Sequence, residues 1–139
     1  MINKIFIGID PDVDKSGFAI LENGKLIIID CDLSDVFNNL SFLKRAEYKF
    51  KVRLEAGHKD KRTWHKGGNG MAKKVGSNHE IGRQIEKFCI KHGIELELVP
   101  PQGYSSVTHE AFCNLTGWDK SIKTNPEKRV AGLLVFGCK

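Results

Sequence analysis

No apolar run in this sequence approaches the roughly 20 residues needed to cross a bilayer, so no membrane-spanning helix is expected. The start of the chain lacks the apolar stretch and small-residue cleavage site of a signal peptide, which favours a cytoplasmic location. Four cysteines occur without a CxxC pair, so a zinc site or a disulfide framework is poorly supported. No GxGxxG or P-loop sequence is present, and a nucleotide cofactor is therefore not expected.

Positive charge is abundant but concentrated in one segment of the chain. The 139 residues carry a formal net charge of +5, and they suffice for one domain with a packed core. From His58 to Lys74 the only anion is Asp60. The cations of this segment, which enclose Trp64 and His65, are Lys59, Lys61, Arg62, Lys66, Lys73 and Lys74.

This basic segment, at about residues 57–77, is rich in glycine and has no apolar periodicity, which predicts a long loop. A mixture of cations, glycine and an aromatic residue is typical of nucleic-acid contacts. We therefore favour a flap that grips phosphates through Lys and Arg and stacks Trp64 on a base or sugar. The alternative is a solvated loop with Trp64 packed against the domain.

Apolar patterning predicts the element order β-β-β-α-β-α-β-α-α, which opens with three antiparallel strands. Asn23-Gly24 is typical of a tight hairpin turn. Ser77 to Glu80 matches a capping box that would begin the central helix, which His92-Gly93 would end. The expected strands span 4–10, 17–21, 25–30, 48–55 and 94–99, and the other expected helices span 33–43 (with Ser34 as a cap), 108–115 and 127–136 (after Asn125-Pro126).

Three acidic residues stand where two-metal phosphodiester hydrolysis would need them. Asp10 ends the buried first strand, Glu55 ends the fourth strand, and Glu127 begins the last helix. Hydrolysis of this kind requires carboxylates that converge from different elements to hold two cations about 4 Å apart. Mg²⁺ prefers such hard oxygen ligands.

The same segments carry a resemblance to a known family. Ile7-Gly8-Ile9-Asp10-Pro11 with 16–20 (SGFAI) resembles the opening of RuvC-type Holliday-junction resolvases, and 52–55 (VRLE) resembles their second acidic strand. Residues 76–82, 99–101 and 125–131 resemble the central helix start, the following strand and the last acidic helix.

The resemblance implies an α/β fold of the RNase H-like type, with a mixed five-stranded sheet, antiparallel strands 1–3 and helices on both faces. It also implies an Mg²⁺-dependent endonuclease, with Mn²⁺ as a substitute, that acts as a homodimer on branched DNA and leaves a 5′-phosphate. Asp10 corresponds to the first catalytic aspartate and Glu55 to the second acidic ligand.

The chain departs from the family in two places. Val130 stands where the family carries Asp, so Glu127 either completes the metal shell or is only a first-turn acid favoured by the helix dipole. Asp12 stands where the family has glycine, followed by Asp14. These two are expected as solvated turn residues, with peripheral metal binding as the alternative.

Three functions stay open at the level of sequence. The first is a four-way junction resolvase. The second is a processing nuclease for structured RNA of the YqgF type, and the third is a nucleic-acid-binding module that has lost catalysis, which Val130 favours.

Overall fold

The computed structural model describes residues 4–60 and 69–139, without the side chains of 69–72. Its strands form one sheet in the order β3-β2-β1-β4-β5. β1, β2 and β3 pair antiparallel, whereas β4 pairs parallel with both β1 and β5. The predicted mixed five-stranded sheet is thereby confirmed. Its strands are β1 Ile5–Asp10, β2 Ser16–Glu22, β3 Lys25–Cys31, β4 Phe50–Glu55 and β5 Glu95–Val99.

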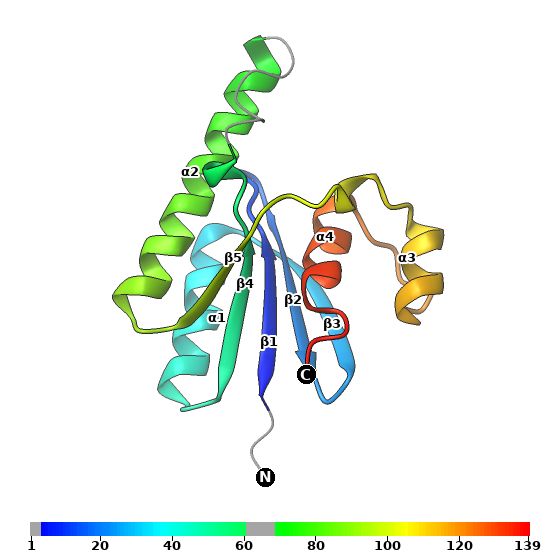
Figure 1. Ribbon diagram of the computed structural model, residues 1–139, viewed down its shortest axis with the longest axis horizontal. Helices are drawn as coiled ribbons and strands as arrows, with labels where there is room; N and C mark the ends of the chain where they lie inside the picture. Colours follow the sequence, from blue (N-terminus) through cyan, green and yellow to red (C-terminus); the bar gives the residue numbers. More distant parts are fainter. Residues whose placement is uncertain (1–3, 61–68) are drawn as a thin grey trace.

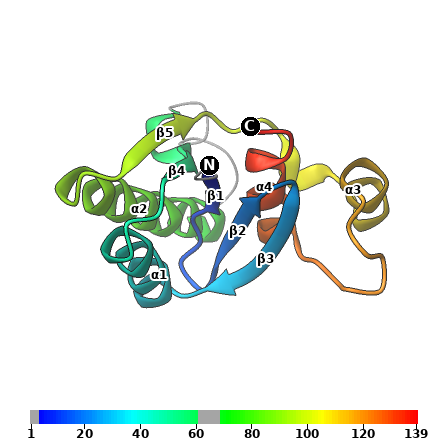
Figure 2. The same cartoon turned by 90° about the horizontal axis from the view of Figure 1, so that it is seen from below.

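Helices cover both faces of this sheet, as predicted (Figures 1 and 2). α1 and α2 enclose a core that includes Ile7, Val52 and Ile85. On the opposite face, Phe112 of α3 and Ala131 of α4 pack against β1, β2 and β3. Within the described residues, no helix is long and apolar enough to cross a membrane. The helices are α1 Leu33–Arg45, α2 Asn69–Lys91, α3 His109–Thr116 and α4 Pro126–Val135, with 3₁₀ turns η1 Gly57–Lys59 and η3 Tyr104–Ser106.

Short-range signals account for several element ends. Asn23 and Gly24 have φ values of 53° and 77°, which suit the predicted tight turn between β2 and β3. Asn125 caps α4 as expected, because its side chain accepts a hydrogen bond from the Lys128 amide at 2.8 Å. The cap of α1 is Asp32 rather than Ser34, since the Asp32 carboxylate accepts from the Asp35 amide at 2.8 Å.

The start of α2 differs from the prediction. The helix begins at Asn69, so 69–76 are helical and Ser77 to Glu80 form no capping box. Glu80 instead pairs with Arg83 at 3.2 Å. This first part of α2 extends beyond the sheet (Figure 1). The sequence did not predict this first part of α2, because its helical apolar spacing begins only at Ile81.

Glycine residues allow α4 to lie directly on the sheet. A Cβ atom at Gly8 of β1 would collide with the carbonyl oxygen of Ala131. A Cβ atom at Gly17 of β2 would collide with the carbonyl oxygen of Glu127. Both clashes would be with helix backbone, which cannot turn aside as a side chain can. These two glycines therefore set how close α4 comes to β1 and β2.

We expect Gly8→Ala to lower the free energy of unfolding by about 2 kcal/mol or more, because α4 would have to move off the sheet. Urea denaturation measures this change. Gly76→Ala is the matched control, since Gly76 is exposed in α2 and, among the described residues outside the neighbouring helix backbone, no atom lies within 4 Å of its Cβ position. It should leave stability unchanged or raise it by up to about 1 kcal/mol. Equal effects of the two substitutions would contradict close packing of α4.

Candidate active site

Asp10 and Glu55 lie side by side at the carboxyl ends of two parallel strands. Ile9 pairs with Leu54, so the next residues of β1 and β4 are Asp10 and Glu55. Ile9 and Leu54 are fully buried towards α1 and α2, and strand alternation turns the two acids to the face that α4 covers. Neighbouring strands are about 4.8 Å apart. Both carboxyl groups are therefore within reach of one hydrated cation.

Glu127 approaches Asp10 from the other side. Gly17 is the register partner of Asp10 on β2, and the backbone of Glu127 rests against Gly17. Glu127 lies half-buried in the first turn of α4. Val130, where an acid was expected from the family pattern, is buried against Val99 and Leu134. Position 130 thus contributes to the core and supplies no carboxylate.

Burial and the charges of neighbouring carboxyl groups strongly perturb Asp10. Burial, followed by the charges of Glu55, Glu127 and Asp12, raises the pKa of Asp10 from 3.8 to about 9. Burial also raises the pKa of Glu55. A carboxyl group with such a pKa holds its proton at neutral pH unless a cation is supplied. The three predicted acids are therefore electrostatically coupled, although they come from β1, β4 and α4.

The donor set suits a hard divalent cation. It consists of carboxylate oxygens from Asp10, Glu55 and Glu127, the ligands that Mg²⁺ prefers. Among the described residues, no group of three or more His, Cys, Asp or Glu side chains is close enough together to hold a metal ion. Mg²⁺ usually keeps several waters and takes only one or two carboxylates directly, so the looser arrangement fits a hydrated ion.

Asp12 and Asp14 belong to the turn after β1. The Asp12 carboxylate accepts a hydrogen bond from the Asp14 amide at 3.0 Å, and the Asp12 amide donates to Ser16 Oγ at 3.1 Å. Asp14 is exposed, as expected for a solvated turn residue, whereas Asp12 is buried. The expectation of a solvated Asp12 is wrong, because its side chain is buried within the turn and its carboxylate accepts the Asp14 amide there.

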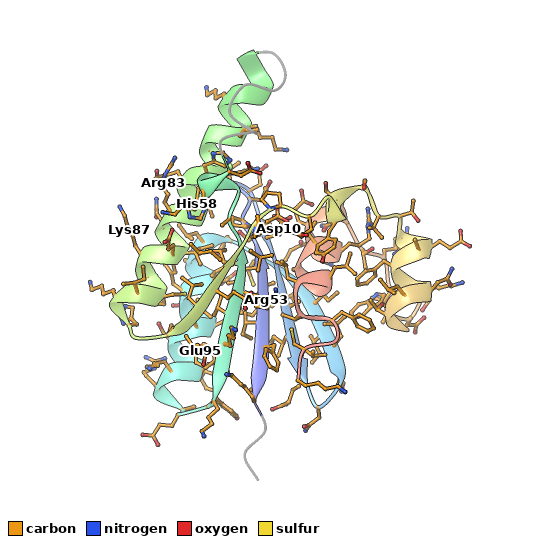
Figure 3. All side chains as sticks on the ribbon, viewed as in Figure 1. Asp10, Arg53, His58, Arg83, Lys87 and Glu95 are labelled. Carbon is orange, nitrogen blue, oxygen red and sulfur yellow. The ribbon has the colours of Figure 1, made fainter. Side chains whose placement is uncertain are left out.

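A cavity of about 200 Å³ opens beside the two strand ends. Asp10, Glu55, His58, Asn78 and His79 are among the residues that line it. Desolvation, together with the charges of Arg83 and His58, lowers the pKa of His79, so its ring is neutral at pH 7. Figure 3 shows Asp10 at the upper end of the sheet, with His58 between the sheet and α2.

Two contacts that join α2 to the strand ends were not predicted. His58 Nε2 lies 2.7 Å from Glu86 Oε1, and the His58 side chain is almost completely buried. The Val13 amide donates to Asn78 Oδ1 at 2.8 Å. The only sequence signal for a role of His58 near the site was its position three residues after Glu55. Asn78 was not considered as a contact residue, because it was assigned to the predicted capping box.

The predicted nucleic-acid contacts divide into two groups. Lys59 is exposed in η1, with its Nζ 3.8 Å from Glu86 Oε1. Lys73 and Lys74 are exposed on α2 rather than on a loop. The remaining residues of the predicted flap, which lie outside the described part of the chain, are Lys61, Arg62, Trp64, His65 and Lys66.

No protein-family model matches the sequence, and no curated protein matches it either. Among solved structures, the chain is similar to T. thermophilus RuvC in complex with a Holliday junction substrate. The two share 13% sequence identity with a TM-score of 0.53, over 94% of this chain and 90% of that chain. This likeness shows the fold: the chain has the RNase H-like architecture of RuvC, as the sequence motifs predicted.

The pKa of Asp10 predicts how the stability of the metal-free protein depends on pH. Between pH 4 and pH 9 the folded protein keeps a proton that the unfolded chain has lost, so the free energy of unfolding should fall as the pH rises. Asp10→Asn mimics the protonated form and should flatten this dependence. In EDTA at pH 8 we expect its melting temperature to exceed that of the wild type by roughly 5 °C.

Thermal denaturation in EDTA from pH 5 to pH 9 measures both effects. Glu95→Gln is the control, because Glu95 is an exposed acid at the opposite end of the sheet (Figure 3). Identical pH profiles for the wild type and Asp10→Asn would contradict the buried acidic cluster.

Proposed function

We propose that the protein is an Mg²⁺-dependent endonuclease for structured nucleic acid, with a four-way DNA junction as its first substrate. The observation that carries this proposal is the placement of Asp10 and Glu55 on adjacent strand ends, with Glu127 brought up by α4. The RNase H-like fold, shared with a protein solved on a Holliday junction, supports the same substrate.

The three acids would hold the metal together in this proposal. Asp10, which lies between the other two, would bind the cations with Glu55 and Glu127. The cations would supply charge stabilisation for the phosphodiester and activate a water for in-line attack. The partial burial of Asp10 and Glu55 would strengthen the attraction between their carboxylates and a bound cation, because charges interact more strongly away from water.

Substitution of each acid tests the catalytic assignment. Asp10→Asn should abolish cleavage of a four-way junction, and Glu55→Gln and Glu127→Gln should each reduce kcat by about 100-fold or more. Glu95→Gln, the control at the far end of the sheet, should cleave normally. Cleavage is measured on junction, linear duplex and structured RNA with Mg²⁺, Mn²⁺ or EDTA. Paired nicks in the junction would also support the expected homodimer.

A binding module without catalysis is the second candidate, and the burial of Val130 favours it. This candidate predicts junction binding without cleavage in either metal. Cleavage of structured RNA alone would instead favour an RNA-processing nuclease of the YqgF type. The same set of incubations therefore distinguishes the three functions.

The exposed lysines of α2 would hold the phosphate backbone without reading sequence. We expect the double substitution Lys73→Ala with Lys74→Ala to weaken binding to all nucleic acids alike and to reduce the salt slope by roughly 1–2. Fluorescence anisotropy at several salt concentrations measures this. Lys4→Ala at the opposite end of β1 is the control, because Lys4 pairs with Glu95 at 3.0 Å. An unchanged salt slope would exclude these two lysines from the interface.

A further inference from the structure

A fourth acid, Asp30, lies in the same row of the sheet as the candidate site. Asp30 of β3 pairs with Gly17, and Gly17 pairs with Asp10. Register partners point to the same face, so Asp30 also faces α4. One strand, β2, lies between Asp30 and Asp10, so the two residues are two strand spacings apart, or about 10 Å. Asp30 is therefore close to the first turn of α4 but removed from the three proposed ligands.

Within the described part of the chain, the side chain of Asp30 makes its polar contacts with the start of α4. Asn125 Nδ2 donates to both carboxylate oxygens of Asp30, at 3.2 and 3.3 Å. Lys128 Nζ lies 3.6 Å from Asp30 Oδ2. Asn125 and Lys128 flank Glu127 in the chain. The carboxylate thus holds the helix turn on both sides of the third proposed metal ligand.

Asn125 performs two tasks with one side chain. Its Oδ1 caps α4 by accepting from the Lys128 amide at 2.8 Å, while its Nδ2 binds Asp30. The next residue of the turn after Lys128 is also held, because Arg129 Nε donates to the Val107 carbonyl at 2.8 Å. Gly17 lets the first turn of α4 touch the sheet, but it has no side chain that could fix the orientation of that turn. The hydrogen bonds from Asn125 to Asp30 of β3 fix this orientation.

We propose that Asp30 is a positioning residue that, through Asn125 and Lys128, holds Glu127 beside Asp10 for binding of the catalytic cation. This inference rests on the proposed function. It explains how the chain places a third carboxylate at the site from the first turn of α4, although position 130 carries valine.

Exchanging the donor and the acceptor between Asn125 and Asp30 tests this positioning role. Asn125→Asp keeps a good helix cap but cannot donate to Asp30, so two carboxylates would face each other. We expect the Mg²⁺ concentration for half-maximal thermal stabilisation to rise by about 10–100-fold. Adding Asp30→Asn restores a donor opposite the new carboxylate. The double variant should return to within about 3-fold of the wild type, because the lost contact is re-formed.

The Mg²⁺ titration is followed by thermal denaturation, which does not depend on cleavage, and kcat is measured in parallel. Glu95→Ala, which removes a different ion-paired acid of the sheet, should leave Mg²⁺ binding unchanged. If Asn125→Asp binds Mg²⁺ like the wild type, or if the double variant fails to recover, the role of Asp30 is overturned. If the wild type itself shows no Mg²⁺ stabilisation, the proposed function fails and this inference falls with it.

Discussion

Direct packing of α4 on glycine positions of β1 and β2 is the constraint on which the candidate site depends. A helix normally stands off a sheet by the thickness of the side chains between them. Gly8 and Gly17 remove that layer, and the carbonyls of Ala131 and Glu127 occupy the space. The first turn of α4 is thereby brought to the end of β1, where Asp10 lies. Without this contact Asp10 and Glu55 would have no third acid from α4 beside them.

The sheet supplies the other half of the arrangement through its register. Parallel pairing of β1 with β4 puts Asp10 and Glu55 in one row, which continues through Gly17 to Asp30. Within this row the acids have different environments. Asp10 is half-buried beside other carboxyl groups and its pKa rises to about 9, whereas Asp30 contacts an amide and an ammonium group. The neighbours of each aspartate, not its residue type, therefore distinguish the proposed cation ligand Asp10 from Asp30, which we propose to have a positioning role.

The helices on the two faces of the sheet contribute differently to the candidate site. α4 provides the carboxylate of Glu127, whereas α2 forms one wall of the adjoining cavity through Asn78 and His79. Hydrogen bonds from α2 reach the segments directly after both strand ends, at Val13 and at His58. Because α2 also carries Lys73 and Lys74 beyond the sheet, the same helix joins the proposed nucleic-acid contacts to the acidic row.

The sequence by itself determined the order of the elements along the chain, the antiparallel opening of the sheet, the hairpin at Asn23-Gly24, the cap at Asn125 and the three candidate acids. These features follow from local patterns: alternation, turn chemistry and an acid at a strand end. Only the tertiary structure decided that residues 69–76 are helical, that Val130 is buried in the core, and that Asp30 binds the start of α4. The sequence of 69–76 has no apolar periodicity to indicate a helix, and a contact between residues 95 positions apart leaves no local signal in the sequence. Such contacts exist only after strand register and helix packing bring the two segments together.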